Sequence, residues 1–475
     1  MSTIAAAPPG QPAHQVAVIG GGWSGCAAAA VLAGHGVQVT LYEAAPALGG
    51  RARRVVRDGL PLDNGQHLLL GAYEATRRML WATHSHATDP GLTRLKLALV
   101  PLAPAAQRPV AIEAARMPPP FDLLVGILRA RGLSRGDRLA TVRWFARLQR
   151  HRFRRPSEET VTQMLAALPD RVISQVWTPI CLAALNTPPE RASAQIFANV
   201  LKRTFTGERG SSDLLLPDVD LSELLPDSVA RILDARDCKV HVRTPVHIRG
   251  VDAAGVHLRS RERRWRKPAA IVAVGPHQLQ VLFDDTALRD PAISGLLEQT
   301  AGWRYEPIAT IYLGFREKLS LPARMMRLDD APGQWLFDRR DVLQRATGAA
   351  NGLRLRSMVA VVISASGDQN GTDGPRLVAA VQAQLKKLRA EWPSCIWSQV
   401  ITERRATYAC MPGLERPVWG RVTRGLYLAG DYTDPELPGT LEAAVRSGEA
   451  AARTLLADRG LLRGELNPPP IKPRP

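Results

Sequence analysis

The clearest apolar–polar pattern lies near the start of the chain. Val16–Ile19 is an apolar run with the length of a buried strand. The glycine-rich segment Gly20–Gly25 follows it, and an alanine-rich helical stretch continues over 26–33. A second strand-like run spans 37–42 and ends on Glu43. This order predicts a strand–helix–strand unit with a glycine turn after its first strand.

The glycines have the G-x-G-x-x-G spacing of a dinucleotide-binding turn. Gly20 permits the tight turn, and Gly22 lets backbone N–H groups approach a pyrophosphate. Gly25 lets the helix pack closely on the strand, and the helix N-terminus favours an anion. Glu43 stands about 20 residues on, where an acid accepts hydrogen bonds from the adenosine ribose. The pattern predicts dinucleotide binding rather than an ordinary glycine turn.

The segment after the acid distinguishes FAD from NAD. Gly49, Gly50 and Arg51 combine a flexible backbone with a guanidinium that can fork onto phosphate oxygens. The alternative is an ordinary loop with a solvated arginine.

Two further apolar runs extend the pattern. Residues 425–431 form a strand-like run ending in Gly430 and Asp431, and 438–448 read as a loop entering a helix. In the interior, 239–242 and 246–248 alternate like strands around a Thr-Pro turn, and 270–276 read as a buried strand ending in a turn.

These motifs resemble those of the flavin-dependent amine oxidase and phytoene desaturase superfamily. The resemblance implies that the N-terminal glycines, Glu43 and the Gly-Gly-Arg segment grip FAD. It further implies that Gly430 and Asp431 contact the pyrophosphate and ribityl chain, and that Val246 contacts the adenine. Gly439 and Thr440 precede a helix whose N-terminus points at the flavin, where reduced flavin carries negative charge. Plain sheet core is the alternative for the interior strands.

The expected fold class is α/β. We expect a Rossmann-like FAD-binding domain assembled from discontinuous segments, with an inserted α+β substrate-binding domain. The segments 14–80, 210–290 and 410–460 are assigned to the first domain, and 81–209 and 291–409 to the second. The proline-rich end, 461–475, is expected to be a disordered tail.

The composition limits the metal sites, disulfides, cellular locations and partners that we expect. The chain has 475 residues, a net charge of +18 and five scattered cysteines without a C-x-x-C pair. We expect no metal site, no disulfide framework and a reducing, cytoplasmic location. The charge suits a polyanion, but no nucleic-acid motif accompanies it, so nucleic acid is not an expected partner. The N-terminus lacks secretory-signal features, and no run of about 20 apolar residues suggests a membrane span.

Finer resemblance concerns the substrate. Segments 62–73, 177–187, 404–408 and 429–433 look like those of the squalene-associated FAD-dependent desaturases, better called hydroxysqualene dehydroxylases. The resemblance runs from about residue 16 to 456. It implies reductive removal of the hydroxyl of hydroxysqualene, a lipophilic C30 isoprenoid, in squalene or hopanoid synthesis. Upstream enzymes of that pathway are the implied partners.

The expected chemistry needs an acid, because hydroxide is a poor leaving group from an allylic carbon. We predict His67 as the proton donor and Gln66 as a positioning group, since both lie on the segment expected beside the flavin. The alternative for His67 is a structural role, and Asp63, Tyr73 and Tyr432 are weaker candidates. Asn186 and Thr187 are predicted to line the substrate cavity, with ordinary loop capping as the alternative.

An apolar run, 117–128, stands before an arginine-crowded segment, 129–155. A short apolar helix with basic flanks can dip into an anionic bilayer surface, which suits a lipid-dissolved substrate. A core helix followed by a solvated basic helix is the alternative. We therefore expect a cytoplasmic protein with peripheral contact to the inner face of the cell membrane.

Two other functions fit the motifs. A phytoene-desaturase-like carotenoid dehydrogenase would move electrons in the opposite direction. A non-catalytic isoprenoid-binding protein, resembling the Rab GDP-dissociation inhibitors, would need no flavin, but the intact glycine and acid set argues against it.

Overall fold

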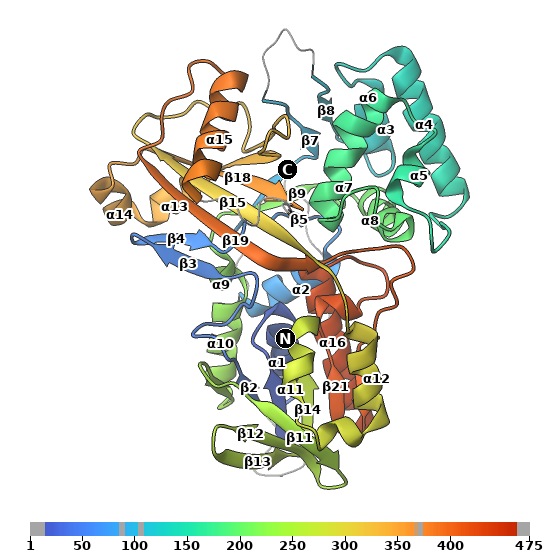
Figure 1. Cartoon of the computed structure of the whole chain (residues 1–475), viewed down its shortest axis with the longest axis vertical. Helices are drawn as coiled ribbons and strands as arrows, with labels where there is room; N and C mark the ends of the chain where they lie inside the picture. The colour runs from blue at the N-terminus through green and yellow to red at the C-terminus, as the bar shows by residue number, and fades with distance from the viewer. Residues whose placement is uncertain (1–14, 85–90, 103–108, 366, 368–373, 463–475) are drawn as a thin grey trace, which may run out of the picture.

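The N-terminal pattern folds as predicted into a strand, a helix and a strand. These are β1 (Gln15–Ile19), α1 (Trp23–Gly34) and β2 (Gln38–Tyr42). The structure, a computed structural model, describes residues 15–84, 91–102, 109–365, 367 and 374–462 (Figure 1). The tail expected over 461–475 falls, from residue 463 onward, outside the described residues. The N-terminal segment 1–14 is also outside them.

β1 and β2 belong to a six-stranded sheet in the lower half of Figure 1. Its order is β10-β2-β1-β14-β21-β20, with the first five strands parallel and β20 antiparallel. The added strands are β10 (Lys239–His241), β14 (Ala269–Val272), β20 (Gly420–Thr423) and β21 (Leu426–Leu428). The strand order reverses between β1 and β14, and ligands bind beyond the carboxyl ends of such strands.

Two helices from opposite ends of the chain pack together on this sheet. α16 (Leu441–Asp458) lies against α1, and Gly448 permits the close approach: a Cβ there would stand 2.1 Å from the Ser24 carbonyl oxygen. The hydroxyls of Ser24 and Ser447 are 3.0 Å apart. The sheet domain therefore closes only when both chain ends are present.

α16 also fixes the start of α2 (Glu74–Thr83). The buried Glu442 carboxylate accepts the backbone N–H groups of Ala75 and Thr76 at 3.0 and 2.9 Å. These donors have no partner within their own helix, so Glu442 supplies a tertiary N-cap.

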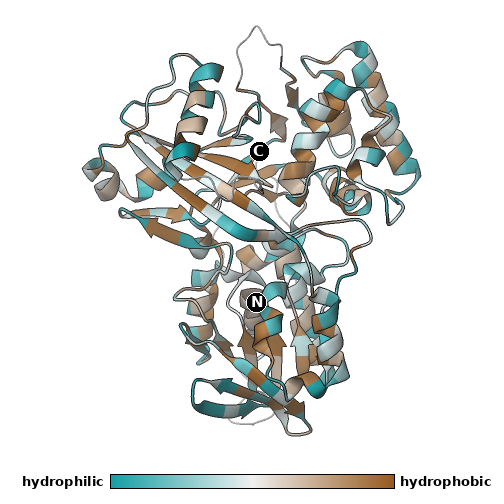
Figure 2. Cartoon of the chain, viewed as in Figure 1, coloured by the Kyte–Doolittle hydropathy of each residue, from teal (hydrophilic) through white to brown (hydrophobic). Residues whose placement is uncertain are grey.

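The two strands predicted over 239–242 and 246–248 belong to different sheets. β10 joins the parallel sheet, whereas the next strand begins a three-stranded antiparallel sheet at the bottom of Figure 1. That sheet contains β11 (His247–Asp252), β12 (Gly255–Ser260) and β13 (Arg263–Lys267). Figure 2 shows the contrast between the hydrophobic parallel strands and this mostly hydrophilic sheet.

The upper half contains a five-stranded antiparallel sheet with the order β16-β17-β18-β15-β19. Its strands are β15 (Tyr305–Phe315), β16 (Met325–Arg327), β17 (Trp335–Asp338), β18 (Ser357–Ser364) and β19 (Trp397–Tyr408). Alternate residues of β15 point to opposite faces. Ile311 and Leu313 pack beneath α15 (Gly374–Leu388), whereas Ile308 faces the functional cavity. The alternating apolar residues of 308–315 and 358–363 predict strands, and the run near 377–388 predicts a helix; all three are confirmed.

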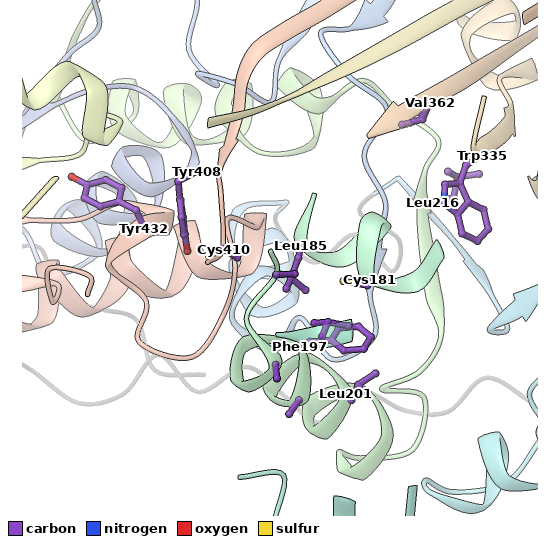
Figure 3. Packing of buried hydrophobic residues seen from close by; sticks show 14 of the residues in the cluster. Cys181, Leu185, Phe197, Leu201, Leu216, Trp335, Val362, Tyr408, Cys410 and Tyr432 are labelled. Atoms are coloured by element: carbon purple, nitrogen blue, oxygen red, sulfur yellow. The ribbon is translucent and has the colours of Figure 1, made fainter. Parts of the chain in front are cut away.

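A helical region lies beside this sheet, within residues 81–209, a segment rich in helix-forming residues. Its helices are α3 (Phe121–Leu128), α4 (Arg135–Arg150), α5 (Val161–Leu165), α6 (Asp170–Val172), α7 (Thr178–Leu185) and α8 (Ala194–Thr206). Aromatic packing holds them together, since the rings of Trp144 and Trp177 are 4.9 Å apart. Figure 3 shows Leu185, Phe197 and Leu201 buried where α7 meets α8.

The remaining elements join the two halves. The short strands are β3 (Arg54–Arg57), β4 (Leu60–Asp63), β5 (Leu69–Leu70), β6 (Leu92–Leu95), β7 (Ala98–Leu99), β8 (Ile112–Glu113) and β9 (Leu214–Pro217). The helices are α9 (Leu221–Leu224), α10 (Pro226–Asp234), α11 (Pro276–Leu282), α12 (Pro291–Thr300), α13 (Arg340–Arg345) and α14 (Thr347–Gly352). α12 packs against α11 and β20, although it lies past the boundary expected at 290. The division into domains stays a prediction.

Candidate functional site

A cavity of about 740 Å³ connects the two halves of the molecule. One end, the polar arm, is lined by Gly22, Glu43, Arg51, Asp431 and Thr440 at the edge of the parallel sheet. The other end, the apolar arm, is lined by side chains of the helical region and the antiparallel sheet. These are Leu99, Ile112, Leu123, Ile127, Trp177, Ile180, Leu201, Phe205, Trp335 and Phe337.

The glycine turn between β1 and α1 forms the floor of the polar arm. Gly20 has a φ of +105°, and a Cβ there would stand 2.5 Å from the Ala273 carbonyl oxygen. Gly22 faces Gly50 with no other atom within 4 Å of its added Cβ, so a side chain would project toward the opening. Gly22 is also the N-cap of α1 and offers no capping side chain. The first turn is therefore open to an anion.

Gly25 does not line the cavity. It lies one helical turn deeper, where an added Cβ would stand 1.9 Å from the Gly20 carbonyl oxygen. This is the close helix–strand packing that the spacing predicts for the third glycine.

Glu43 ends β2 at the polar arm, as expected. Its Oε2 accepts the Gly21 N–H at 2.6 Å, and its Oε1 accepts the Ala45 N–H at 2.7 Å. Both bonds fix the carboxylate beside the glycine turn. Val246 lines the same cavity and is 7 % exposed. The structure thus brings together the two residues predicted for the adenosine end.

Arg51 and Asp431 meet across the polar arm. Arg51 donates to Asp431 Oδ1 at 2.6 Å and to the Ala406 carbonyl at 2.8 Å. The guanidinium compensates a carboxylate that would otherwise repel a pyrophosphate. The predicted contacts of both residues with FAD stay predictions, but the pairing shows how an acid fits into an anion site.

The remaining predicted FAD residues complete the same arm. Gly49 and Gly50 have φ values of +110° and +58°, conformations that favour glycine. Gly430, at φ +154°, turns the chain after β21. Gly439 and Thr440 line the cavity, and Thr440 Oγ1 accepts the Ala443 N–H at the start of α16.

These features fit FAD. The polar arm supplies an uncapped helix N-terminus for phosphate, a carboxylate for a ribose and small residues that keep the backbone accessible. Gly22 gives the decisive observation, because any side chain there would occupy the opening.

Gln66 joins the cavity to a buried charge cluster that sequence reasoning missed. Arg339 is 1 % exposed and lies between Asp63 and Asp341 at 3.4 and 3.1 Å. It also donates to Gln66 Oε1 at 2.5 Å. Gln66 Nε2 in turn donates to the His67 carbonyl at 2.9 Å. These bonds fix both ends of the Gln66 amide, which supports its predicted positioning role.

The charge cluster contains Asp63, Asp341 and Arg339, and Arg324 pairs with the Asp341 carboxylate at 2.9 Å. Burial raises the pKa of Asp63 to about 7, although Arg339 beside it acts in the opposite direction. Burial also raises the pKa of Asp341. Arg339 keeps its charge, because the two carboxylates raise its pKa against the effect of burial. Arg339 is therefore the cation that favours the ionised form of Asp63, and it shares this role at Asp341 with Arg324.

His67 lines the cavity beside Gln66. Its Nδ1 lies 2.8 Å from the Gly65 carbonyl oxygen, which can only accept, so Nδ1 carries the proton. In the neutral ring Nε2 is therefore the acceptor. Burial, with a smaller contribution from Arg51, lowers the His67 pKa. The resting imidazole accepts a hydrogen bond at Nε2, and it can act as an acid only after it gains a proton there.

The structure separates the two predicted substrate residues. Asn186 lines the cavity and ends α7 with a φ of +48°. Its amide donates to the Glu306 carbonyl at 3.1 Å and accepts the Ala365 N–H at 2.7 Å. Thr187 is fully buried off the cavity, and its hydroxyl accepts the Cys410 N–H at 3.0 Å. Thr187 thus has the loop role that was the alternative reading.

His277 also lines the cavity, and it is not among the residues predicted from the sequence. Burial, Arg405 and Arg51 lower its pKa to about 4, so it is neutral near pH 7. Its position directly after the Gly-Pro that follows β14 is the signal that would have found it. The apolar arm carries no comparable motif, except that Trp177 and Ile180 belong to the predicted 177–187 segment.

The fold and the polar arm define an FAD-binding oxidoreductase architecture. The family model of the flavin containing amine oxidoreductases matches residues 23–456, and the chain belongs to this family. The protein is therefore an FAD-dependent oxidoreductase, and the expected fold class and cofactor are confirmed.

Curated relatives span nearly the whole chain. A hydroxysqualene dehydroxylase from Rhodopseudomonas palustris is 29 % identical, and the alignment covers 93 % of this chain and 98 % of that protein. A 15-cis-phytoene desaturase from Synechococcus elongatus is 24 % identical over 93 % of this chain and 96 % of its own. The sequence resemblance to the hydroxysqualene dehydroxylases is thus confirmed.

Solved structures share the fold. An oxidoreductase from Methanosarcina mazei superposes with a TM-score of 0.70 at 15 % identity, covering 92 % of this chain and 99 % of that one. Cyclohexylamine oxidase from Brevibacterium oxydans gives a TM-score of 0.63 at 19 % identity, with 94 % and 99 % covered. Within the described part of the chain, no helix combines the length and apolar character needed to cross a membrane.

Proposed function

We propose that the protein catalyses the FAD-dependent reductive dehydroxylation of hydroxysqualene to squalene. The observation that carries this proposal is the shape of the cavity, in which an apolar arm continues directly from the FAD-binding arm. Aliphatic and aromatic side chains predominate along that arm, which suits a polyene without charged groups. Three curated relatives that are named hydroxysqualene dehydroxylase support the choice of substrate.

The overall reaction removes the substrate hydroxyl as water and places a hydride on the same allylic skeleton. Reduced FAD, when bound, supplies the hydride. The protein must supply a proton to the leaving hydroxyl and keep bulk water away from the electron-deficient carbon. The apolar arm serves the second task, because aliphatic and aromatic side chains make up most of its wall.

His67 is the proposed proton donor in its protonated form. His67 lines the cavity, and its Nε2 is the ring nitrogen left available because Nδ1 is bound to the Gly65 carbonyl. Gln66 holds the backbone of His67 through the 2.9 Å bond to its carbonyl, which fixes the ring position. Asn186 ties the apolar arm to β15 and so acts on the cavity shape.

The test is an anaerobic single turnover. The purified holoenzyme is reduced and mixed with hydroxysqualene, while flavin absorbance is followed and lipids are extracted. We expect flavin reoxidation with a stoichiometric amount of squalene. Reduced flavin that stays reduced in the presence of hydroxysqualene would refute the proposal.

A phytoene-desaturase-like activity is the second candidate, because desaturases are also among the relatives. It requires oxidised flavin and leaves a new conjugated double bond in the product. The same apolar arm suits such a substrate, so product analysis under oxidising conditions distinguishes the two activities. Upstream pathway enzymes remain proposed partners through their supply of the C30 alcohol.

A further inference from the structure

α3 is apolar on both of its faces. Leu123 and Ile127 on the inner face are 5 % and 3 % exposed and line the apolar arm. Phe121 and Leu128 on the outer face are 52 % and 48 % exposed. Leu124 and Val125 stand between them at helical spacing and are half-buried. A surface helix of a globular protein normally turns polar side chains outward, so this outer face needs a partner.

The exposed apolar surface extends past the helix ends. Met117, just before α3, is 42 % exposed, and Leu139 on the neighbouring α4 is 46 % exposed. α3 and α4 pack against each other, and Arg138 of α4 donates to the Leu128 carbonyl at 3.0 Å. We call Met117, Phe121, Leu124, Val125 and Leu128 the α3 outer patch.

Positive charge surrounds the α3 outer patch. Residues 116–150 contain eight arginines and two aspartates. Asp122 is 3 % exposed and accepts the Ser212 hydroxyl, and Asp137 belongs to the capping box of α4. Arg116, Arg129, Arg131 and Arg135 flank α3, and all four are exposed. None of these four forms an ion pair within the described part of the chain.

We propose that the α3 outer patch docks on an anionic lipid bilayer. Its apolar side chains would enter the interface between headgroups and acyl chains, while the flanking arginines contact lipid phosphates. Charge complementarity selects this occupant, because a second copy of the chain would bring the same cluster of arginines against itself.

Docking in this orientation places the apolar arm beside the bilayer. A helix is about 10 Å thick including its side chains, and α3 carries most of the outer patch on one face and part of the cavity wall on the other. The proposal rests on the surface of the protein and holds whichever lipophilic substrate the cavity takes.

Vesicle flotation of the holoenzyme tests the proposal. One set of vesicles contains phosphatidylcholine only, and the other contains phosphatidylcholine mixed with phosphatidylglycerol. We expect the protein to float with the anionic vesicles and to be released by high salt. We expect F121D/L128D to weaken this binding by about tenfold or more, and R129E/R131E to weaken it several-fold.

Matched variants separate the patch from general basicity. Val418→Asp introduces the same charge at an apolar side chain that is 68 % exposed elsewhere. R261E/R264E reverses two exposed arginines at the β12–β13 hairpin. Both controls should float like the wild type, and flavin absorbance checks that every variant is folded.

Three results would overturn the proposal. The wild type could fail to float with anionic vesicles, or the control variants could lose binding as strongly as the patch variants. Light scattering could instead show an oligomer that F121D/L128D dissociates, which would assign the patch to a second copy of the chain.

Discussion

Gly25 is the position in the cofactor turn with the least room for a side chain. An added Cβ would stand 1.9 Å from the Gly20 carbonyl oxygen, so Gly25→Ala must push α1 away from β1. We expect a loss of about 1–3 kcal/mol in stability and a lower flavin content. Thermal melting and the ratio of flavin to protein absorbance measure both effects.

Gly295 provides the control for this substitution. It is an exposed glycine within α12, and no atom lies within 4 Å of its added Cβ. Gly295→Ala should stabilise the protein by about 1 kcal/mol through helix propensity. Equal behaviour of the two variants would contradict the packing role of Gly25.

His67 gives a prediction about pH. Its pKa lies below the ordinary histidine value of 6.5, and only the protonated ring can donate from Nε2. The rate of the proposed dehydroxylation should therefore rise as pH falls from neutrality, until the His67 pKa is passed. His67→Gln should lower the rate by about 100-fold or more and remove this dependence. Single-turnover rates across the acidic range measure it, and an unchanged profile in the variant would exclude His67 as the donor.

At the scale of elements, the charge cluster connects β4 with the end of β17 and the start of α13. Arg339→Met would leave Asp63 buried without a cation, whereas Asp341 would keep its ion pair with Arg324. We expect a loss of about 3–5 kcal/mol at neutral pH. The loss should shrink in acid, because the Asp63 carboxylate can then take up a proton. Urea unfolding at both pH values measures the difference.

Arg340 is the neighbouring control. Its side chain is 55 % exposed and pairs with Asp338. Arg340→Met should cost at most about 1 kcal/mol, because exposed ion pairs contribute little. A similar cost for Arg339→Met would mean that the cluster does not depend on its buried cation.

Elements with a local signal could be predicted from the sequence. β1, α1 and β2 combine a short apolar run, a glycine turn and an alanine-rich stretch, and each forms where expected. β15 and β18 alternate clearly and were also predicted. The sequence could not show that β10 and β11 enter different sheets, since strand pairing depends on contacts far along the chain.

The site shows the same division. The residues of the polar arm follow a spaced motif, so the sequence indicated nearly all of them. Arg339 lies 276 positions from Asp63, and no spacing rule links the two. The apolar arm consists of ordinary core residues that differ from their neighbours only in facing a cavity. Thr187 was misplaced because adjacent residues of a loop can point in different directions.

At the scale of the whole molecule, the predicted FAD site lies where segments from both ends of the chain meet, so bound FAD should stabilise the complete fold. A ligand at a hundredfold excess over its Kd stabilises the folded state by about 2.7 kcal/mol. We therefore expect removal of FAD to lower the Tm by several degrees and its return to restore the Tm.

FMN provides the comparison, because it lacks the adenosine end that Glu43 and Val246 are positioned to bind. FMN should restore little of the lost Tm. Full recovery with FMN would show that the adenosine end of the polar arm contributes nothing to binding.

The pairing of Arg51 with Asp431 has a consequence for the life of the nascent chain. These residues are separated by 380 positions, and the two serines that join α1 to α16 by 423. At about 5–20 residues per second, a ribosome synthesises the N-terminal and C-terminal parts of the polar arm on the order of 20–80 s apart. Throughout that interval the glycine turn exists without its closing strand and helix. Cofactor loading is therefore a post-translational event, and a ribosome that stops before β21 releases a chain that cannot keep its flavin.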